Sequence, residues 1–246
     1  GVSSLWLETD ADGRRVLVQH DPTQEAPRPH RLRVGLYDVH DGRLVLRERI
    51  ELGIDQERTD VDLPDADLVL LNDGDLTYAK ARLDDTSLAT VTEGLSTLED
   101  VLVRGLVWSS LWNATRDGEL PTARFLEIVR RHAPAESSIG LLTGVLANAA
   151  FAVQHYTTDA ARTAERSSWL ETTWSALQSA DAGSDAQLAW ARAFATASLY
   201  DDARADDVRG ILDGQAPTGL PMDADLRWML LTALAATGHA DAERIA

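Results

Sequence analysis

Hydrophobic and polar residues alternate in short runs over the first third of the chain. Each run is about six residues long and rich in β-branched and large apolar residues, which is typical of half-buried strands. The pattern predicts strands over 5–9, 14–19, 31–36, 44–49, 59–63 and 68–71. Asp12-Gly13 and Asp41-Gly42 separate neighbouring runs and predict tight hairpin turns. Residues 1–84 are therefore expected to form a small antiparallel β-sandwich domain.

After Asp84 the apolar residues recur with a helical period instead. Thr97 and Asp100 resemble a capping box, and Gly118 follows the apolar run of that helix. About eight amphipathic, alanine-rich helices are expected; the later ones are predicted near 121–134, 137–149, 160–180, 185–199, 202–212 and 223–237. Short loops and a loose 40-residue period favour a HEAT/armadillo-like α-helical solenoid over 85–246. A further helix starts near His239 and stops at Ala246, so we expect this domain to be cut off.

Composition excludes several classes of protein. The 246 residues contain no cysteine, which rules out disulfides and thiolate metal sites and favours a cytoplasmic location. No apolar run reaches the roughly 20 residues that a membrane helix needs, and the first residues do not resemble a signal peptide. The net charge of −17 repels phosphate groups, so we expect no nucleic-acid and no membrane partner. An acidic surface also fits plain solubility, or attraction of basic peptides.

A search for catalytic chemistry finds no motif. None of the six histidines lies four residues from another, so no H-E-x-x-H zinc helix is present; they are His20, His30, His40, His132, His155 and His239. Carboxylates cluster at Asp10 with Asp12 and at 201–207, and we interpret them as a hairpin turn and helix caps. Glycine-rich phosphate loops and G-x-S-x-G elbows are missing. We therefore assign no catalytic, no cofactor-binding and no metal-binding residue.

Arginine and tryptophan side chains are weaker candidates for a functional role. Four arginines on predicted helices can reach a concave face and hold a peptide carboxylate, although surface salt bridges are the simpler interpretation: Arg104, Arg116, Arg192 and Arg227. Six tryptophans follow helical stripes and are expected in the core: Trp108, Trp112, Trp169, Trp174, Trp190 and Trp228.

The order of residues in the segment 67–84 indicates more about the origin of the chain than its composition does. An apolar strand ends at Asn72, and Tyr78 starts a second short strand with Lys80 before Asp84. Asparagine tolerates a tight turn, and we expect Tyr78 to be half-buried with its hydroxyl bonded. This order resembles the junction of the β-sandwich and helical domains in aminopeptidase N-type zinc peptidases, the gluzincin family of membrane alanyl aminopeptidases.

Further segments extend the resemblance over nearly the whole chain. They resemble sandwich strands and terminal-domain helices of the actinobacterial-type branch, and comprise residues 35–38, 42–45, 106–120, 184–192 and 222–228. The family's zinc ligands, glutamate base and amino-terminus-binding motif belong to preceding domains, so no catalytic residue is carried over. Residues 1–5 resemble the linker after the catalytic domain, and both ends are expected to be boundaries of a fragment.

The resemblance implies a non-catalytic carboxyl-terminal region of a zinc metalloaminopeptidase that removes amino-terminal residues from peptides. The fragment is expected to be inactive by itself and to contain no cofactor, with zinc bound elsewhere in the parent enzyme. Its expected partners are the catalytic domain of its own chain and peptide substrates, whose access it limits. The alternative is a stand-alone helical-repeat interaction scaffold, and a hidden enzyme using scattered acids or histidines is a further rival.

Overall fold

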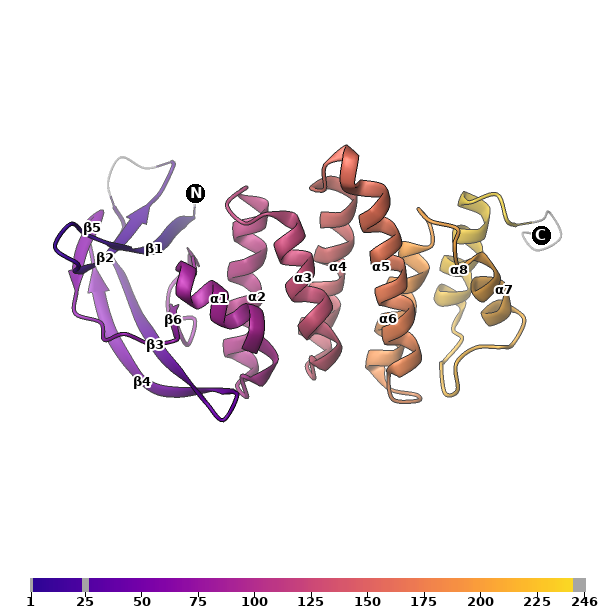
Figure 1. Ribbon diagram of the computed structural model, residues 1–246, viewed down its shortest axis with the longest axis horizontal. Coiled ribbons are helices and arrows are strands. Elements are labelled where there is room, and N and C mark those ends of the chain that lie inside the picture. The colour runs from indigo at the N-terminus through magenta and orange to yellow at the C-terminus, as the bar shows by residue number, and fades with distance from the viewer. Residues whose placement is uncertain (1, 24–26, 241–246) are drawn as a thin grey trace. The chain divides into compact units, whose positions relative to one another are not determined.

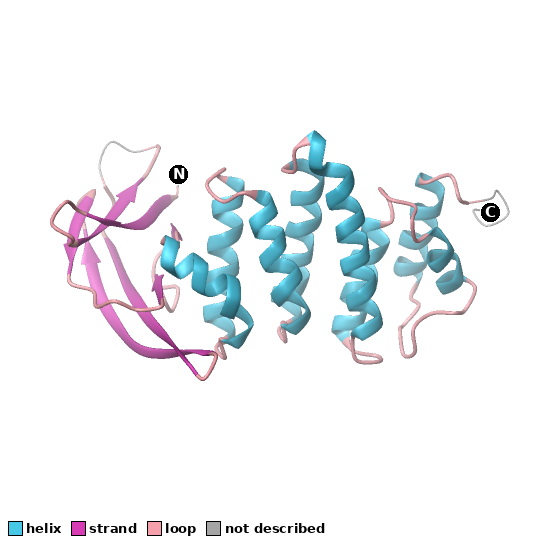
Figure 2. Ribbon diagram, viewed as in Figure 1, coloured by secondary structure: helices cyan, strands magenta, loops and turns pink. Residues whose placement is uncertain are grey.

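The computed structural model describes residues 2–23 and 27–240. The described residues form seven strands, eight α-helices and two short 3-10 helices, and the strands all precede the helices (Figures 1 and 2). The chain divides into two compact units, Gly1–Pro121 and Thr122–Ala246. Within the described residues, no helix combines the length and the apolar character that a membrane crossing needs.

Two sheets build most of the first unit. One has the order β5-β2-β1-β7, with bounds β1 Ser3–Thr9, β2 Arg15–His20, β5 Arg58–Val61 and β7 Ala79–Ala81. The other has the order β4-β3-β6, with bounds β3 His30–His40, β4 Arg43–Ile54 and β6 Leu68–Leu71. All ladders are antiparallel except that of β1 with β7, which is parallel. The predicted strands are confirmed, including the short strand expected between Tyr78 and Asp84, which is β7.

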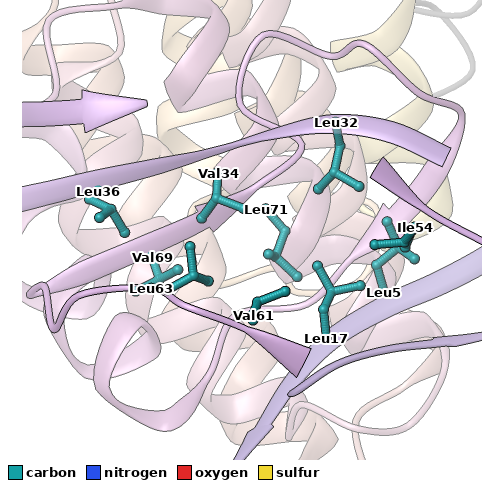
Figure 3. Close-up of a cluster of buried hydrophobic side chains, with 10 residues drawn as sticks. All are labelled: Leu5, Leu17, Leu32, Val34, Leu36, Ile54, Val61, Leu63, Val69 and Leu71. Atoms are coloured by element: carbon teal, nitrogen blue, oxygen red, sulfur yellow. The ribbon is translucent and has the colours of Figure 1, made fainter. Parts of the chain in front are cut away.

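The two sheets share one hydrophobic core (Figure 3). Leu32, Val34 and Leu36 point into it from β3, as their alternation predicts, and none of the three is exposed. Leu5 and Leu17 reach the same core from the other sheet and are equally buried. Each such side chain contributes about 1.5–3 kcal/mol by leaving water. This shared core holds the sheets together.

Residues in the left-handed region close the tight turns. Asp41 and Gly42 have φ of 49° and 75°, which suits the primed hairpin turn that the Asp-Gly pair predicts between β3 and β4. Asn72 has φ of 59°, so it turns the chain sharply after β6. Its side chain brackets Thr77: Nδ2 donates to the Thr77 carbonyl at 2.8 Å and Oδ1 accepts from the Thr77 amide at 3.1 Å. The predicted role of Asn72 is confirmed.

A buried carboxylate ties β3, β4 and the turn after β6 together. Asp73 is 1% exposed, and its Oδ2 accepts from the Tyr37 hydroxyl at 2.7 Å and from Arg49 Nε at 2.9 Å. The Asp73 amide also donates to the Arg33 carbonyl at 3.0 Å. The carboxylate lies so close to Gly35 that a Cβ there would come within 2.1 Å of Oδ2. Glycine at position 35 therefore makes room for this network.

Two helices complete the first unit, α1 Asp85–Gly94 and α2 Val101–Arg116, with the 3-10 turn η1 Leu95–Thr97 between them. Asp100 caps α2 by accepting from the Leu102 amide at 2.9 Å. The expected capping box starting at Thr97 is wrong, because the Thr97 hydroxyl instead donates to the Gly94 carbonyl and accepts from the Leu44 amide.

An ion cluster joins β7 to the end of α2. Lys80 Nζ lies 2.7 Å from Asp117 Oδ2, and Arg82 donates to both Asp117 and Glu119. The desolvation of Asp117 acts to raise its pKa, but hydrogen bonds from Lys80 and Arg82 outweigh it and lower the pKa below the ordinary value. Arg82 is buried, so its charge requires these carboxylates.

Between residues 122 and 240 the second unit contains six α-helices: α3 Thr122–His132, α4 Ile139–His155, α5 Asp159–Ser179, α6 Asp185–Ala197, α7 Ala205–Leu212 and α8 Ala224–Ala236, with the 3-10 turn η2 Ala133–Ala135 after α3. Helix α4 packs on α3, α5 and α6, while α8 packs on α6 and α7. Buried alanines such as Ala149 and Ala195 allow the helix axes to approach closely. The predicted helices from 160 onward are confirmed to within three residues.

Several detailed expectations are wrong. Trp228 is 64% exposed on α8 rather than in the core, and Tyr78 is 81% exposed rather than half-buried. Most of the expected last helix, residues 241–246, lies outside the described residues. The strands end at Ala81 and the helices begin at Asp85, whereas the compact units divide after Pro121, so the domain boundary at residue 84 stays a prediction.

Candidate functional site

The second unit contains a groove between α4 and α6 that has the size and lining of a ligand-binding site. It encloses about 580 Å³, and the buried Trp169 of α5 forms part of its lining. Three large apolar or aromatic side chains stand exposed along it: Ile139 at 42%, Phe151 at 46% and Tyr200 at 48%. Exposed aromatic groups around an apolar hollow are typical of binding surfaces.

The sequence creates the hollow by placing small residues between large ones. Ile139, Ala147 and Phe151 fall on one face of α4, since they are separated by multiples of four residues. Ala189 and Ala193 lie on the facing side of α6 at the same spacing. The large residues stand at the ends of the α4 face while alanine occupies the middle. Missing side-chain volume at the centre therefore leaves an apolar slot.

Ion pairs and aromatic contacts fix the rim of this groove. Arg192 Nη2 lies 2.9 Å from Asp223 Oδ2. The pKa of Asp223 is lowered, first by the hydrogen bond from the Leu226 amide and then by Arg192. Arg166 donates to Gln154 Oε1 at 2.6 Å and lies over the Tyr200 ring at 5.1 Å from its centroid. These contacts orient the polar groups along the rim.

Few ionisable side chains line the groove. They are Asp185, His155, Arg192 and Tyr200, and Arg192 is paired with Asp223. Across residues 2–23 and 27–240, no three histidine, cysteine or acidic side chains come together in a way that could hold a metal ion. The apolar lining of the groove suits binding of an apolar side chain.

The acidic clusters considered from the sequence are occupied by structural contacts. Asp10 Oδ1 accepts from the amides of Asp12 and Arg14 at 2.9 and 2.8 Å, which makes it part of the hairpin turn. In the second unit, Asp202 Oδ2 lies 3.0 Å from His239 Nε2, and this hydrogen bond lowers the pKa of Asp202. The other three acids there bond to hydroxyl or guanidinium groups: Asp201 to Ser167, Asp206 to Arg209 and Asp207 to Arg204.

The histidines are equally dispersed. His30 is buried and its Nδ1 lies 2.7 Å from the Thr77 hydroxyl, and burial lowers the pKa of His30. His132 is buried at the end of α3, and His155 lies in the groove. His20 and His40 end strands β2 and β3 and are exposed.

Of the four arginines considered for a peptide carboxylate, Arg192 alone lies in the groove lining. Arg104 is buried and donates to the carbonyls of Leu98 and Glu99, so its role is structural. Arg116 ends α2 and Arg227 lies on α8, both exposed. The groove itself was not predicted. The pattern that marks it is alanine at the centre of two helix faces, with Ile139 and Phe151 at the ends of one.

Comparison with known proteins identifies the family. The family described as ERAP1-like C-terminal domain matches residues 68–246. Aminopeptidase N of Streptomyces lividans is 41% identical over 258 aligned positions, which cover 98% of this chain and 30% of that protein. The chain thus spans less than a third of the length of the curated relative that it matches.

These matches confirm the resemblance to the carboxyl-terminal region of aminopeptidase N-type enzymes. The similarity reaches both units of the chain, including the strands before residue 68. The chain therefore belongs to the family of ERAP1-like C-terminal domains.

Proposed function

We propose that this chain is the non-catalytic carboxyl-terminal part of a zinc-dependent aminopeptidase and limits which peptides reach the active site. The observation that carries the proposal is the 41% identity to an aminopeptidase N over 98% of the chain. A β-sandwich over 1–84 and a helical solenoid over 85–246 would serve as wall and spacer beside the catalytic domain of the same polypeptide. The cysteine-free composition supports a cytoplasmic location.

We expect the zinc ion to be bound in another part of the longer polypeptide. This expectation is supported by the described residues, among which no three histidine, cysteine or acidic side chains come together in a way that fits a catalytic zinc ion. The contribution of these residues is to bind and position a peptide.

In this proposal the peptide substrate contacts the chain in the groove between α4 and α6. Its apolar lining and exposed Phe151 and Tyr200 fit an apolar side chain of a peptide that is too long to lie wholly in a catalytic cleft. Binding there would add affinity for long peptides and leave short substrates unaffected. The net charge of −17 would further favour basic peptides, in a salt-sensitive way.

Two experiments test the proposal. The chain alone, supplied with zinc, should show no turnover of alanyl or leucyl anilides above background, and turnover would mean that it contains a catalytic site. In the longer polypeptide that carries this chain, Ala147→Trp should fill the groove and lower kcat/KM for long peptides while the anilides are unaffected. Ala160→Trp on the exposed side of α5 is the matched control and should change neither.

The stand-alone scaffold gives a different result. It requires that no longer polypeptide exists, so the reading frame around these residues and the zinc content of the purified native protein decide between the two functions. One zinc ion per polypeptide together with peptidase activity supports the aminopeptidase, and a metal-free, inactive native protein supports the scaffold.

A further inference from the structure

Strand β1 is longer than the strand that covers its outer edge. On one side β2 pairs with β1 from Ser4 to Thr9. On the other side β7 pairs only with Ser3, Ser4 and Leu5. The last contact of this short parallel ladder is the Arg82 amide, which donates to the Leu5 carbonyl at 2.9 Å. The chain then leaves the sheet and starts α1 at Asp85.

The backbone beyond Leu5 therefore has an open edge. Successive residues of a strand direct their N–H and C=O groups to opposite sides, and Leu5 directs its carbonyl toward β7. Leu7 and Thr9 must then direct their backbone groups to the same side. Along this part of the described chain, no backbone hydrogen bond from that side reaches Leu7 or Thr9. Open strand edges of this kind can pair with another extended chain.

A hollow lies along this open edge. It encloses about 710 Å³ and is lined by β1 at residues 4 and 6–9, by the chain that leaves β7 at 82–86, and by Glu119, Arg15 and His20. All of these residues belong to the first unit. Trp6 stands at the hollow, and its indole donates to Glu8 Oε1 at 2.8 Å. The hollow thus adjoins the unpaired groups of β1 and, because Arg15 and His20 belong to β2, also extends over the neighbouring strand.

The charges around the hollow favour a basic occupant. Both arginines of the lining are already neutralised, Arg15 by Asp65 and Arg82 by Asp117 and Glu119. In contrast, no ion pair within the described residues involves Asp84 or Asp85. The residual charge of the lining is therefore negative. A cation placed here would gain from it, and from the neighbouring indole of Trp6.

We propose that the open edge of β1 binds an extended basic peptide segment, which adds as a strand at Leu7 and Thr9 and continues the line of β7. Backbone hydrogen bonds to these two residues supply affinity, and basic side chains on alternate positions face Asp85 and Trp6. The partner is a polypeptide, because recognition occurs through backbone amides. This site is separate from the groove on the second unit and does not depend on the function proposed above.

The test uses the whole chain and an acetylated, amidated heptapeptide of alternating valine and arginine. A second peptide carries glutamate in place of arginine. We expect the arginine peptide to bind at least ten times more tightly, and its affinity to fall with salt. Amide hydrogen exchange should slow at Leu7 and Thr9 when it binds. Two further peptides are N-methylated either at all valines or at all arginines.

Strand addition uses the amides of one alternating set only, so one N-methylated peptide should lose binding and the other should keep it. Methylation of the arginine set abolishes binding if the added strand is parallel to β1, and methylation of the valine set does so if it is antiparallel. Thr9→Pro removes one amide donor of the edge and should weaken binding at least tenfold, while the matched Thr9→Ala should not.

Three outcomes overturn the proposal: no binding of the arginine peptide, equal binding of both N-methylated peptides, or slowed exchange confined to residues outside β1. Far-UV circular dichroism checks the fold of Thr9→Pro. Should that variant unfold, the N-methylated peptides decide the question on the unchanged chain.

Discussion

Replacing Gly35 by alanine tests the buried network of the first unit most directly. A Cβ at this position would lie 2.1 Å from Asp73 Oδ2 and 2.7 Å from Tyr37 Cε2, so the carboxylate and the ring must both shift. Asp73 would then lose the Tyr37 hydroxyl, Arg49 Nε, or both. The perturbation is one methyl group, yet it acts on a charge that is 1% exposed.

The expected cost follows from two opposing effects. Leaving a buried charge without its partners costs about 3–5 kcal/mol. Replacing glycine by alanine inside a strand stabilises by roughly 0.5–1 kcal/mol, because the unfolded chain becomes less flexible. We therefore expect Gly35→Ala to lower the free energy of unfolding of the first unit by about 2–4 kcal/mol.

Gly53 provides a matched control in the neighbouring strand β4, since nothing lies within 4 Å of a Cβ built there. Gly53→Ala should leave the stability unchanged or raise it by up to about 1 kcal/mol. The assay is native-state hydrogen exchange of amides in β3 and β6, which reports the first unit separately. In an Asp73→Ala background, the cost of Gly35→Ala should fall by more than half. A Gly35→Ala protein within about 1 kcal/mol of the Gly53→Ala control would refute the reasoning, because it would show that Asp73 moves freely.

Three further predictions concern single residues. Burial, together with the hydrogen bond to Asp73, raises the pKa of Tyr37. The stability that the neutral Tyr37 side chain contributes is therefore complete below about pH 10, the ordinary tyrosine value, and is lost at higher pH. Alkaline urea titrations should therefore show a fall in stability above pH 10 that is smaller in Tyr37→Phe. Asn72→Ala should destabilise by at least about 1 kcal/mol more than Asn72→Gly in thermal unfolding, because φ is 59° there. Trp228→Ser should change stability by no more than about 0.5 kcal/mol in the same assay, since the side chain is 64% exposed; a loss of several kcal/mol would contradict the exposed position.

Local patterns predicted the elements well. The Asp-Gly pairs, the alternation of Leu32, Val34 and Leu36, and the helical periods depend on neighbours within a few residues, which the sequence displays directly. The exception in the sheets is β4, where a bulge opposite Leu36 and Tyr37 changes the register. As a result Leu44 and Leu46 lie opposite Val39 and Tyr37, whereas Ile50 and Leu52, beyond the bulge, lie opposite the core residues Val34 and Leu32.

Long-range partners could not be predicted. Asp73 meets Tyr37 and Arg49, which are 36 and 24 residues away, and no local pattern indicates that pairing. Trp228 and Tyr78 were misplaced for the same reason: an aromatic residue on a helical stripe or beside a turn becomes buried only if another element covers it. The groove likewise depends on the contact between two helices. Its alanines could not be recognised as groove residues without knowing that α4 packs on α6.

The ladders of β6 and β7 have a practical consequence for anyone dividing this polypeptide. The family match starts at residue 68, so it includes both strands but omits their pairing partners, β3 for β6 and β1 for β7. A protein expressed from residue 68 would expose Val69 and Leu71, which belong to the core shared by the two sheets and are each at most 2% accessible in the intact chain. Such a product should aggregate, whereas one that begins before β1 keeps every ladder.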